Sequence, residues 1–450
     1  MPGALLTDLY ELNMAASYLR RRMIAPATFS LFVRKLPANR GFLVAAGVSD
    51  CLDWLEQFSF TPADLDYLAS IGFDDDSLES FAPLRFSGDV WGVPEGRMVF
   101  AGEPIYEVTA PIAEGQLVET YLLNQVSLQT TLATKAARCR IAAAARIELV
   151  DFSFRRTQGI EAGLAAARLT GMVGFTATSN VEAARRYGLR PAGTMAHSYI
   201  EAFPTELDAF YAFVADHPGQ ATFLVDTYDT LGGVAHAIEV IDHLGLHRHA
   251  AIRLDSGDLA ALAVCARRML DRAGMPEVRI FASGGLDEND LAAFVSHRVP
   301  IDAVGVGTRM GVSADAPYLD SAYKLVAYDG RAVAKLSTGK ATLPGPKQVY
   351  RGHGMRDVIA RRDEPRPDGT YPLLEPIMRD GQRVSPMEAV AAGRARFEAD
   401  LAQLPDEARD LRSPVAPIAA ITPRLRQLTD EVQDAARRLA GTVDHSSVPE

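Results

Sequence analysis

Residues 251–258, with the sequence AIRLDSGD, combine a short apolar strand pattern with a polar turn that follows it directly. The same pattern, usually followed by a helical one, recurs through the middle of the chain at intervals of roughly 20 to 30 residues. The strand signals begin near residues 147, 172, 222, 251, 279 and 302, and the stretch near 193 fills the gap after 172. Seven such signals in succession favour a (β/α) barrel over an open parallel sheet.

Residues 1–115 are predicted to form an N-terminal α+β domain. Helical patterns cover the start of the chain and residues 47–84, with short strand signals between and after them. The expected strands lie at 27–34, 84–86, 97–100 and 105–108.

Residues 116–320 are predicted to form the α/β barrel domain, and residues 321–450 to form C-terminal strands and helices. A helical pattern over 116–145 opens the barrel domain, and Asp329-Gly330 is a strong hairpin signal after it. The other expected elements are short strands up to about 382, helices at 386–402 and 422–440, and a frayed tail from 445.

Composition and charge exclude several classes of function. The 450 residues are 48% hydrophobic and 23% charged, as in ordinary globular proteins. The net charge of −11, without a run of Lys and Arg, argues against nucleic acid and anionic membrane as partners. Three cysteines far apart indicate neither disulfides nor a metal cluster. Without a signal peptide or membrane-spanning pattern, we expect a cytoplasmic protein.

The stretch GTMAHS, residues 193–198, surrounds one imidazole with small residues and hydroxyls. Gly193 allows a ligand to approach the backbone, and Thr194 and Ser198 offer donors to phosphate oxygens. His197 carries the side chain that most readily exchanges protons or phosphoryl groups near neutral pH. The alternative is a histidine at a helix start, bonded to a backbone carbonyl.

The RLDSGD stretch, residues 253–258, carries the most specific chemistry. Arg253 and Asp255 can point the same way from a strand, and the arginine can bind a carboxylate or phosphate through two parallel bonds. Asp255 and Asp258 can hold Mg²⁺ through water and phosphate oxygens. The alternative is a structural Arg–Asp pair that caps the next helix.

Other strand ends add an aromatic ring and two glycine-rich turns. Phe152 with Arg155 suits a flat anionic ring, although core packing beside a surface charge is the alternative. The turns at 283–285 and 305–308 fit a phosphate cradle, and either one alone also reads as a tight turn.

Near the N-terminus, Leu9, Leu12 and Met14 are predicted to form the buried side of a helix. Tyr10 falls outside that pattern and reads either as a ligand contact or as a surface tyrosine.

Taken together, these stretches resemble the nicotinate phosphoribosyltransferase family. They cover most of residues 7–351 in the expected order, and the region after 351 matches less distinctly. The matching pieces are TDLYELNM (7–14), FVRKLP (32–37), DFSFRR (151–156), FTATSNVEAA (175–184), GTMAHS (193–198), RLDSGDL (253–259), SGG (283–285) and GVGT (305–308).

The resemblance implies the irregular α/β barrel of type II phosphoribosyltransferases beside an α+β domain built from both ends of the chain. It implies transfer of phosphoribosyl from phosphoribosyl pyrophosphate to nicotinate, giving nicotinate mononucleotide. ATP as co-substrate would be hydrolysed through a phosphohistidine at His197, with Mg²⁺ as the metal. A homodimer is expected, with Tyr10 entering the site of the second subunit.

The resemblance and the residue chemistry together assign the expected site. The catalytic residues are His197 and Asp255, and the expected metal ligands are Asp255 and Asp258. The nicotinate-binding residues are Tyr10, Phe152, Arg155, Ser179, Thr194 and Arg253. The residues for phosphoribosyl pyrophosphate are Ser198, Ser283, Gly284, Gly285, Gly307 and Thr308.

Two other functions stay open. A non-catalytic barrel that senses a phosphorylated metabolite would keep the glycine turns but have no use for His197 and Asp255 together. A nicotinamide phosphoribosyltransferase would use the amide instead of the acid. Nicotinamide-using relatives carry an aspartate at the position that matches Ser179, whose hydroxyl can donate to a carboxylate. The alternative role for Ser179 is to cap a helix that begins near Asn180.

Overall fold

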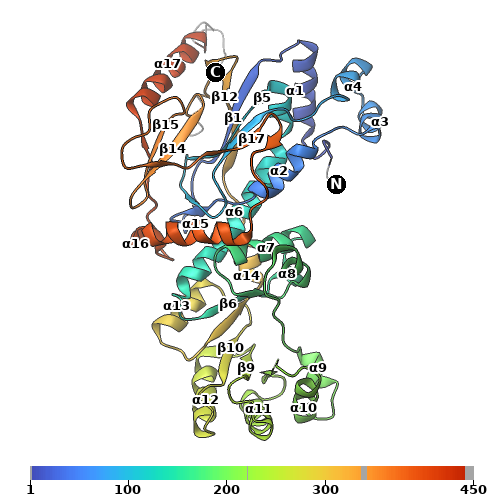
Figure 1. The fold of residues 1–450 in the computed structure, drawn as a ribbon, viewed down its shortest axis with the longest axis vertical. Helices are drawn as coiled ribbons and strands as arrows, with labels where there is room; N and C mark the ends of the chain where they lie inside the picture. The colour runs from blue at the N-terminus through green and yellow to red at the C-terminus, as the bar shows by residue number, and fades with distance from the viewer. Residues whose placement is uncertain (1–2, 220, 336–341, 441–450) are drawn as a thin grey trace, which may run out of the picture. The chain divides into compact units, whose positions relative to one another are not determined.

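The computed structural model describes residues 3–219, 221–335 and 342–440, and the tail that is predicted to fray lies outside them (Figure 1). The chain divides into two compact units. The first unit comprises Met1–Thr131 with Tyr318–Glu450, and the second comprises Leu132–Pro317.

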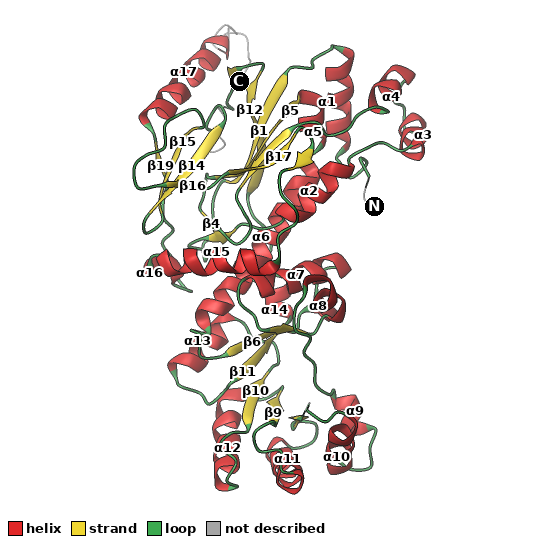
Figure 2. Ribbon diagram, viewed as in Figure 1, coloured by secondary structure: helices red, strands yellow, loops and turns green. Residues whose placement is uncertain are grey.

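A seven-stranded antiparallel sheet forms the centre of the first unit, and both ends of the chain contribute to it (Figure 2). Its order is β13-β12-β1-β5-β3-β17-β18. The strands are β1 (Pro26–Val33), β3 (Asp89–Gly92), β5 (Pro104–Pro111), β12 (Ser321–Tyr328), β13 (Arg331–Ala332), β17 (Glu375–Arg379) and β18 (Gln382–Arg383). Asp329 and Gly330 join β12 to β13 with φ values of 49° and 71°, which confirms the predicted hairpin.

Smaller sheets and helices complete the first unit. A four-stranded sheet has the order β16-β14-β15-β19, and β2 (Leu43–Val44) pairs with β4 (Met98–Val99). The strands of the four-stranded sheet are β14 (Lys347–Gly352), β15 (Arg356–Arg361), β16 (Tyr371–Pro372) and β19 (Ala420–Ile421). The helices are α1 (Leu9–Arg20), α2 (Val48–Gln57), α3 (Pro62–Ser70), α4 (Asp75–Phe81), α5 (Ile112–Leu117), α15 (Val390–Gln403), α16 (Asp406–Arg409) and α17 (Pro423–Ala440), and α6 (Glu119–Ala142) crosses the boundary between the units.

Two predictions for the first unit are wrong. Residues 84–86 form no strand, and β3 begins only at Asp89 because the chain first turns at the end of α4. In α1, Leu9 is exposed while Glu11, Leu12 and Ala15 are buried. The Glu11 carboxylate is accommodated because it accepts hydrogen bonds from Thr7 and Thr120.

A curled six-stranded parallel sheet forms the second unit, in the order β7-β6-β11-β10-β9-β8. The strands are β6 (Glu148–Asp151), β7 (Ala177–Thr178), β8 (Thr222–Leu224), β9 (Ala251–Leu254), β10 (Arg279–Ala282) and β11 (Ala303–Val306). In the part of the chain that the structure describes, β7 and β8 do not pair with each other, so the sheet stays open as a half-barrel.

Two of the expected barrel strands are absent from this described sheet. Residues 172–175 end a helix instead, because α7 runs to Met172 and Gly174 has a φ of 101°. A short apolar run at the end of a buried helix has the same pattern as a strand. The stretch near 193 contributes only an isolated bridge between Thr178 and Pro191, because glycine and proline interrupt it.

Helices follow the strands and begin at their carboxyl ends. Side chains of Asn180, Asp229 and Asp258 cap three of them by accepting backbone N–H bonds. The helices of the second unit are α7 (Ile160–Met172), α8 (Val181–Tyr187), α9 (His197–Glu201), α10 (Glu206–Asp216), α11 (Thr230–Leu244), α12 (Leu259–Arg272), α13 (Glu288–Ser296) and α14 (Thr308–Gly311), with a 3₁₀ turn at Phe154–Arg156.

Candidate active site

A cavity of about 370 Å³ lies at the carboxyl edge of the half-barrel. Parallel strands bring their carboxyl ends to one edge, so residues far apart in the sequence meet there. Most of the expected catalytic and nicotinate-binding residues line this cavity. The lining comprises Phe152, Phe154, Arg155, Ser179, Gly193, Thr194, Met195, Ala196, His197, Leu224, Arg253 and Asp255.

Arg253 is the centre of the polar contacts in this cavity. Its Nη1 donates to Thr194 Oγ1 at 2.9 Å, and its Nε donates to Ser283 Oγ at 2.8 Å. Its Nη2 donates to Asp255 Oδ1 at 2.7 Å, and the side chain is only 12% exposed. The guanidinium carbon also lies 5.6 Å from the centroid of the Phe152 ring. A fixed cation beside an aromatic face therefore forms the floor of the cavity.

Asp255 stays ionised in this surrounding. Burial by itself would raise the pKa of its carboxyl, but the hydrogen bond from Ser283 and the charges of Arg253 and His197 outweigh burial. The pKa of Asp255 therefore lies below its ordinary value.

His197 is the first residue of α9, and other side chains approach both of its ring nitrogens. Nδ1 lies 3.2 Å from Thr227 Oγ1, and Nε2 lies 3.8 Å from Asp255 Oδ2. The side chain is 42% exposed, so the ring is oriented yet open to a ligand. The ring nitrogens thus contact side chains, whereas the alternative considered for His197 was a bond to a backbone carbonyl.

Ser179 follows β7 and lines the cavity without capping a helix. Its backbone N–H donates to the carbonyl of Asp151 at 2.8 Å. The N-cap of α8 is Asn180, whose side chain accepts from the N–H of Ala183 at 3.0 Å. The capping role considered for Ser179 is therefore wrong, because its neighbour fills it.

The glycine turns lie next to Asp255 and Phe152. A Cβ added to Gly284, which has a φ of +109°, would lie 2.1 Å from the Asp255 carbonyl oxygen. A Cβ on Gly305 would lie 2.5 Å from the Phe152 ring. Only glycine fits at these positions. Gly307 precedes α14, Thr308 begins it, and Ser198 is exposed on α9. None of the six residues expected to bind phosphoribosyl pyrophosphate lines the 370 Å³ cavity.

Asp258, an expected metal ligand, caps α12 by accepting from the N–H of Ala261 at 3.1 Å. Sequence reasoning did not single out Asp226, which lies two residues after β8 and contacts the same turn. Its Oδ2 accepts from Ser256 Oγ at 2.5 Å and from the Asp255 N–H at 3.3 Å. Its Oδ1 is buried and has no partner among the described residues.

Asp151, at the end of β6, is a second residue that sequence reasoning did not single out. Its carboxylate accepts from Ser153 Oγ at 2.6 Å and from Thr178 Oγ1 at 2.7 Å, which ties the ends of β6 and β7 together. Burial raises the pKa of this carboxyl despite these bonds. The signal for both carboxylates was their place at or just after the carboxyl end of a strand, and Asp151 also begins the DFSFRR stretch.

Tyr10 belongs to the first unit, on an exposed part of α1. Burial of its hydroxyl and the nearby Glu119 and Glu11 carboxylates raise its pKa, so the side chain remains a neutral phenol. Its expected role in a second subunit's site stays a prediction.

An aromatic ring, a fixed guanidinium, an imidazole and carboxylates at the carboxyl edge of a parallel half-barrel form the kind of site that α/β-barrel enzymes use. Residues 5–127 match the nicotinate phosphoribosyltransferase N-terminal domain, and residues 147–325 match the nicotinate phosphoribosyltransferase family. The chain belongs to the nicotinate phosphoribosyltransferase family.

Individual relatives agree with this assignment. A nicotinate phosphoribosyltransferase of Mycobacterium tuberculosis is 48% identical over 91% of this chain and 89% of its own. A Bacillus subtilis relative of the same name is 42% identical over 80% and 76% of the two chains. The crystal structure of human nicotinic acid phosphoribosyltransferase superposes with a TM-score of 0.84 at 29% identity, covering 95% of this chain and 99% of its own. Among the described residues, no helix is long and apolar enough to cross a membrane.

Proposed function

We propose that this chain transfers the phosphoribosyl group of phosphoribosyl pyrophosphate to nicotinate, with ATP hydrolysed alongside. The observation that carries the proposal is the position of Arg253, which lies beside the Phe152 ring and adjoins the Asp255–His197 pair. Arg253 and Phe152 would bind nicotinate. Asp255 would stabilise the charge on the ribose, and His197 would accept the phosphoryl group of ATP. Family membership supports the choice of substrates.

Nicotinate is a flat ring with a carboxylate, and the cavity matches both features. The ring would lie against Phe152, and the carboxylate would accept bonds from Arg253 and from the hydroxyls of Ser179 and Thr194. Arg155 is exposed at the rim and adds positive charge. Tyr10 of a second subunit would cover the other face of the ring.

Loss of pyrophosphate leaves positive charge on the ribose ring. The Asp255 carboxylate would stabilise that charge, and its lowered pKa keeps it ionised for this role. The glycine turns at 283–285 and 305–308, with Ser198, are the proposed phosphate contacts. Asp255 and Asp226 would hold Mg²⁺ better than Asp255 and Asp258, because Asp258 already caps α12 while Asp226 Oδ1 has no partner among the described residues. When bound, Mg²⁺ would neutralise the leaving pyrophosphate.

His197 is the proposed acceptor of a phosphoryl group from ATP. A ring nitrogen attacks the γ-phosphorus, the bond to the β-phosphate oxygen breaks, and ADP leaves with the electron pair. Water later hydrolyses the phosphohistidine to free imidazole and inorganic phosphate. Thr227 and Asp255 orient the ring for both steps. The added negative charge would help to order the cationic residues of the site.

One assay separates this proposal from its alternatives. Purified protein is incubated with phosphoribosyl pyrophosphate, Mg²⁺, γ-labelled ATP and either nicotinate or nicotinamide, and the mononucleotide product and acid-labile protein label are measured. The expected result is product together with a label that disappears in His197→Ala. A metabolite sensor would give neither, and a nicotinamide enzyme would use the amide at least as well as the acid.

The proposed homodimer has its own test. Tyr10→Ala and His197→Ala should each be inactive or weak, because each damages every site of its own dimer. Mixing the two under conditions of subunit exchange should restore activity, because one hybrid site then carries neither substitution. Full exchange without recovery would show that Tyr10 does not serve a neighbouring subunit's site.

A further inference from the structure

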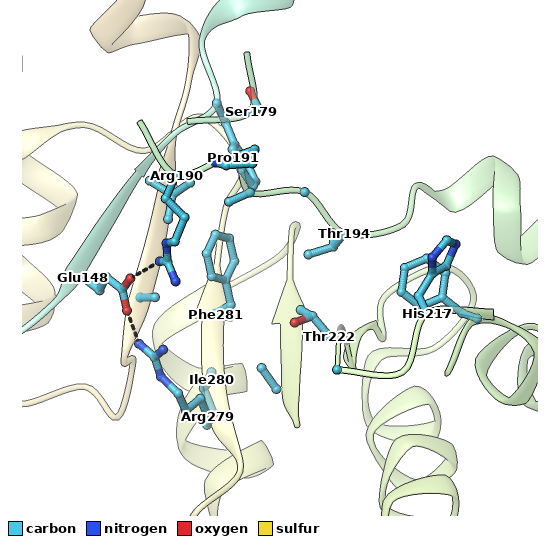
Figure 3. A pocket seen from close by; sticks show the side chains of 18 of the residues that line it. Glu148, Ser179, Arg190, Pro191, Thr194, His217, Thr222, Arg279, Ile280 and Phe281 are labelled. Carbon is cyan, nitrogen blue, oxygen red and sulfur yellow. Dashed lines mark hydrogen bonds and ion pairs between the residues drawn. The ribbon is translucent and has the colours of Figure 1, made fainter. Parts of the chain in front are cut away.

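The inner face of the half-barrel lines a second and larger cavity of about 680 Å³, which is open to solvent (Figure 3). The first residues of five strands line it, which places it toward the amino-terminal edge of the sheet. These residues are Glu148, Thr222, Ala251, Arg279 and Ala303. Side chains normally fill this space in a closed barrel. Here the sheet is open, and alanine and threonine side chains are too small to fill it.

A charged cluster lies at the amino-terminal end of the cavity (Figure 3). Glu148 Oε1 accepts from Arg190 at 2.7 Å, and Oε2 accepts from Arg279 at 2.7 Å. One carboxylate between two guanidinium groups leaves a formal charge of +1. The arginine side chains are 63% and 51% exposed, so N–H groups remain for a further acceptor.

An apolar section connects this cluster to the active site. Val150 and Phe281 line the 680 Å³ cavity between the charged cluster and Phe152, and the Phe281 and Phe152 ring centroids are 5.6 Å apart. Four residues line both cavities: Phe152, Ser179, Gly193 and Thr194. The larger cavity is thus a continuation of the nicotinate pocket, with a cationic end that nicotinate does not need.

We infer that the inner cavity is a second ligand site, which takes an elongated aromatic carboxylate. Its rings would pack against Phe281 and Val150, and its carboxylate would bind Arg190 and Arg279 by charge-assisted hydrogen bonds. The cavity volume lies within the usual range of ligand sites, about 300 to 1,000 Å³. A ligand that fills it reaches Ser179 and Thr194 and therefore competes with nicotinate.

The first measurement is calorimetric titration of the full chain with biphenyl-4-carboxylate, without nicotinate, phosphoribosyl pyrophosphate or ATP. The wild type should bind one molecule, and the neutral 4-(hydroxymethyl)biphenyl should bind at least about tenfold more weakly. Arg190→Gln with Arg279→Gln should weaken the acid about tenfold or more. Arg185→Gln, on exposed α8 outside both cavities, is the matched control and should not change binding.

Glu148→Gln gives the sharper readout, because it frees both guanidinium groups and raises the local charge. This variant should bind biphenyl-4-carboxylate several-fold more tightly, whereas a merely structural cluster would loosen and bind more weakly. Far-UV circular dichroism and the melting temperature establish that each variant folds, and Arg279→Gln alone replaces the double variant if that one does not.

Three results would overturn the second site. They are equal binding of the acid and the alcohol, binding that depends on Arg253 but not on Arg190 and Arg279, and weaker binding by Glu148→Gln. Because the titration contains no substrate, its failure leaves the proposed transferase reaction intact. In turnover assays, biphenyl-4-carboxylate should raise the KM for nicotinate and leave kcat unchanged.

Discussion

Both edges of the half-barrel carry arginine–carboxylate ion pairs, but the arginine is almost buried at one edge and the two arginines are exposed at the other. At the carboxyl edge, Arg253 is almost buried and bonded to Thr194, Ser283 and Asp255. At the amino edge, Arg190 and Arg279 are exposed and share one carboxylate, that of Glu148.

The difference shows how burial decides the use of an ion pair. A nearly buried guanidinium that is held by three side chains offers one geometry, which suits positioning of a reacting ring. An exposed cluster with unused donors offers charge without fixed geometry, which suits binding rather than catalysis. The predictions below test this contrast.

The largest effect is expected for His197→Ala. ATP hydrolysis coupled to product should fall to background, a loss of at least ~10²-fold, because no other imidazole lines the described active-site cavity. The melting temperature should hardly change, because the side chain is partly exposed. Parallel assays of ADP and nicotinate mononucleotide check this. A variant that still hydrolyses ATP in step with product would remove His197 from the mechanism.

Arg253→Lys should have the next largest effect. Lysine keeps the charge but cannot bond to Thr194, Ser283 and Asp255 at once, because it lacks the planar fork. We expect kcat/KM for nicotinate to fall about 100-fold, near the upper contribution of hydrogen bonds to charged groups. Arg185→Lys is the control at an exposed position. Equal losses in both variants would mean that the fixed geometry of Arg253 has no special role.

The carboxyl-edge site was largely predictable from sequence. Arg253 and Asp255 lie at the carboxyl end of a correctly predicted strand, and the ends of parallel strands converge whatever the details of the sheet. The roles of these residues came from their chemistry and from the family resemblance, and neither depends on exact strand bounds. The prediction therefore survived two wrong strands, at 172–175 and near 193.

The amino-edge cluster was not predictable in the same way. Glu148 is 42 residues from Arg190 and 131 residues from Arg279, and no motif connects them. Glu148 on β6 meets Arg279 on β10 across β11, where the residue paired with Glu148 is the small Ala303, and only the folded sheet reveals this register. Asp226 escaped notice because a single carboxylate at a strand end is equally typical of a helix cap.

Ser179→Asp should have a smaller effect than Arg253→Lys. The wild type should use nicotinate far better than nicotinamide, and the new carboxylate should repel nicotinate and lower its kcat/KM about tenfold. Ser179→Ala removes only the hydroxyl and serves as the control with a weaker loss. Steady-state kinetics with both bases provide the measurement. Unchanged nicotinate kinetics in Ser179→Asp would assign the preference to Arg253 and Thr194 alone.

The smallest effect is a pH-dependent contribution of Asp255 to stability. Its pKa is lower in the folded protein than in the unfolded chain. Its contribution is therefore complete above the unfolded value of about 3.9 and is lost as the pH falls through the lower folded value. We expect Asp255→Asn to lower the free energy of unfolding by about 1 kcal/mol at pH 6. The difference in the free energy of unfolding between the wild type and Asp255→Asn should persist to pH 5 and shrink below pH 4.

The salt dependence of the free energy of unfolding distinguishes the two edges. Urea unfolding of Asp255→Asn and Glu148→Gln is compared with the wild type at low salt and in about 1 M NaCl, where the Debye length is about 3 Å. The exposed Glu148 pairs should lose their effect, because solvent ions screen them. The Asp255 pairs are more buried and should keep most of theirs. Equal salt sensitivity at both edges would contradict the contrast between a fixed catalytic arginine and an open binding cluster.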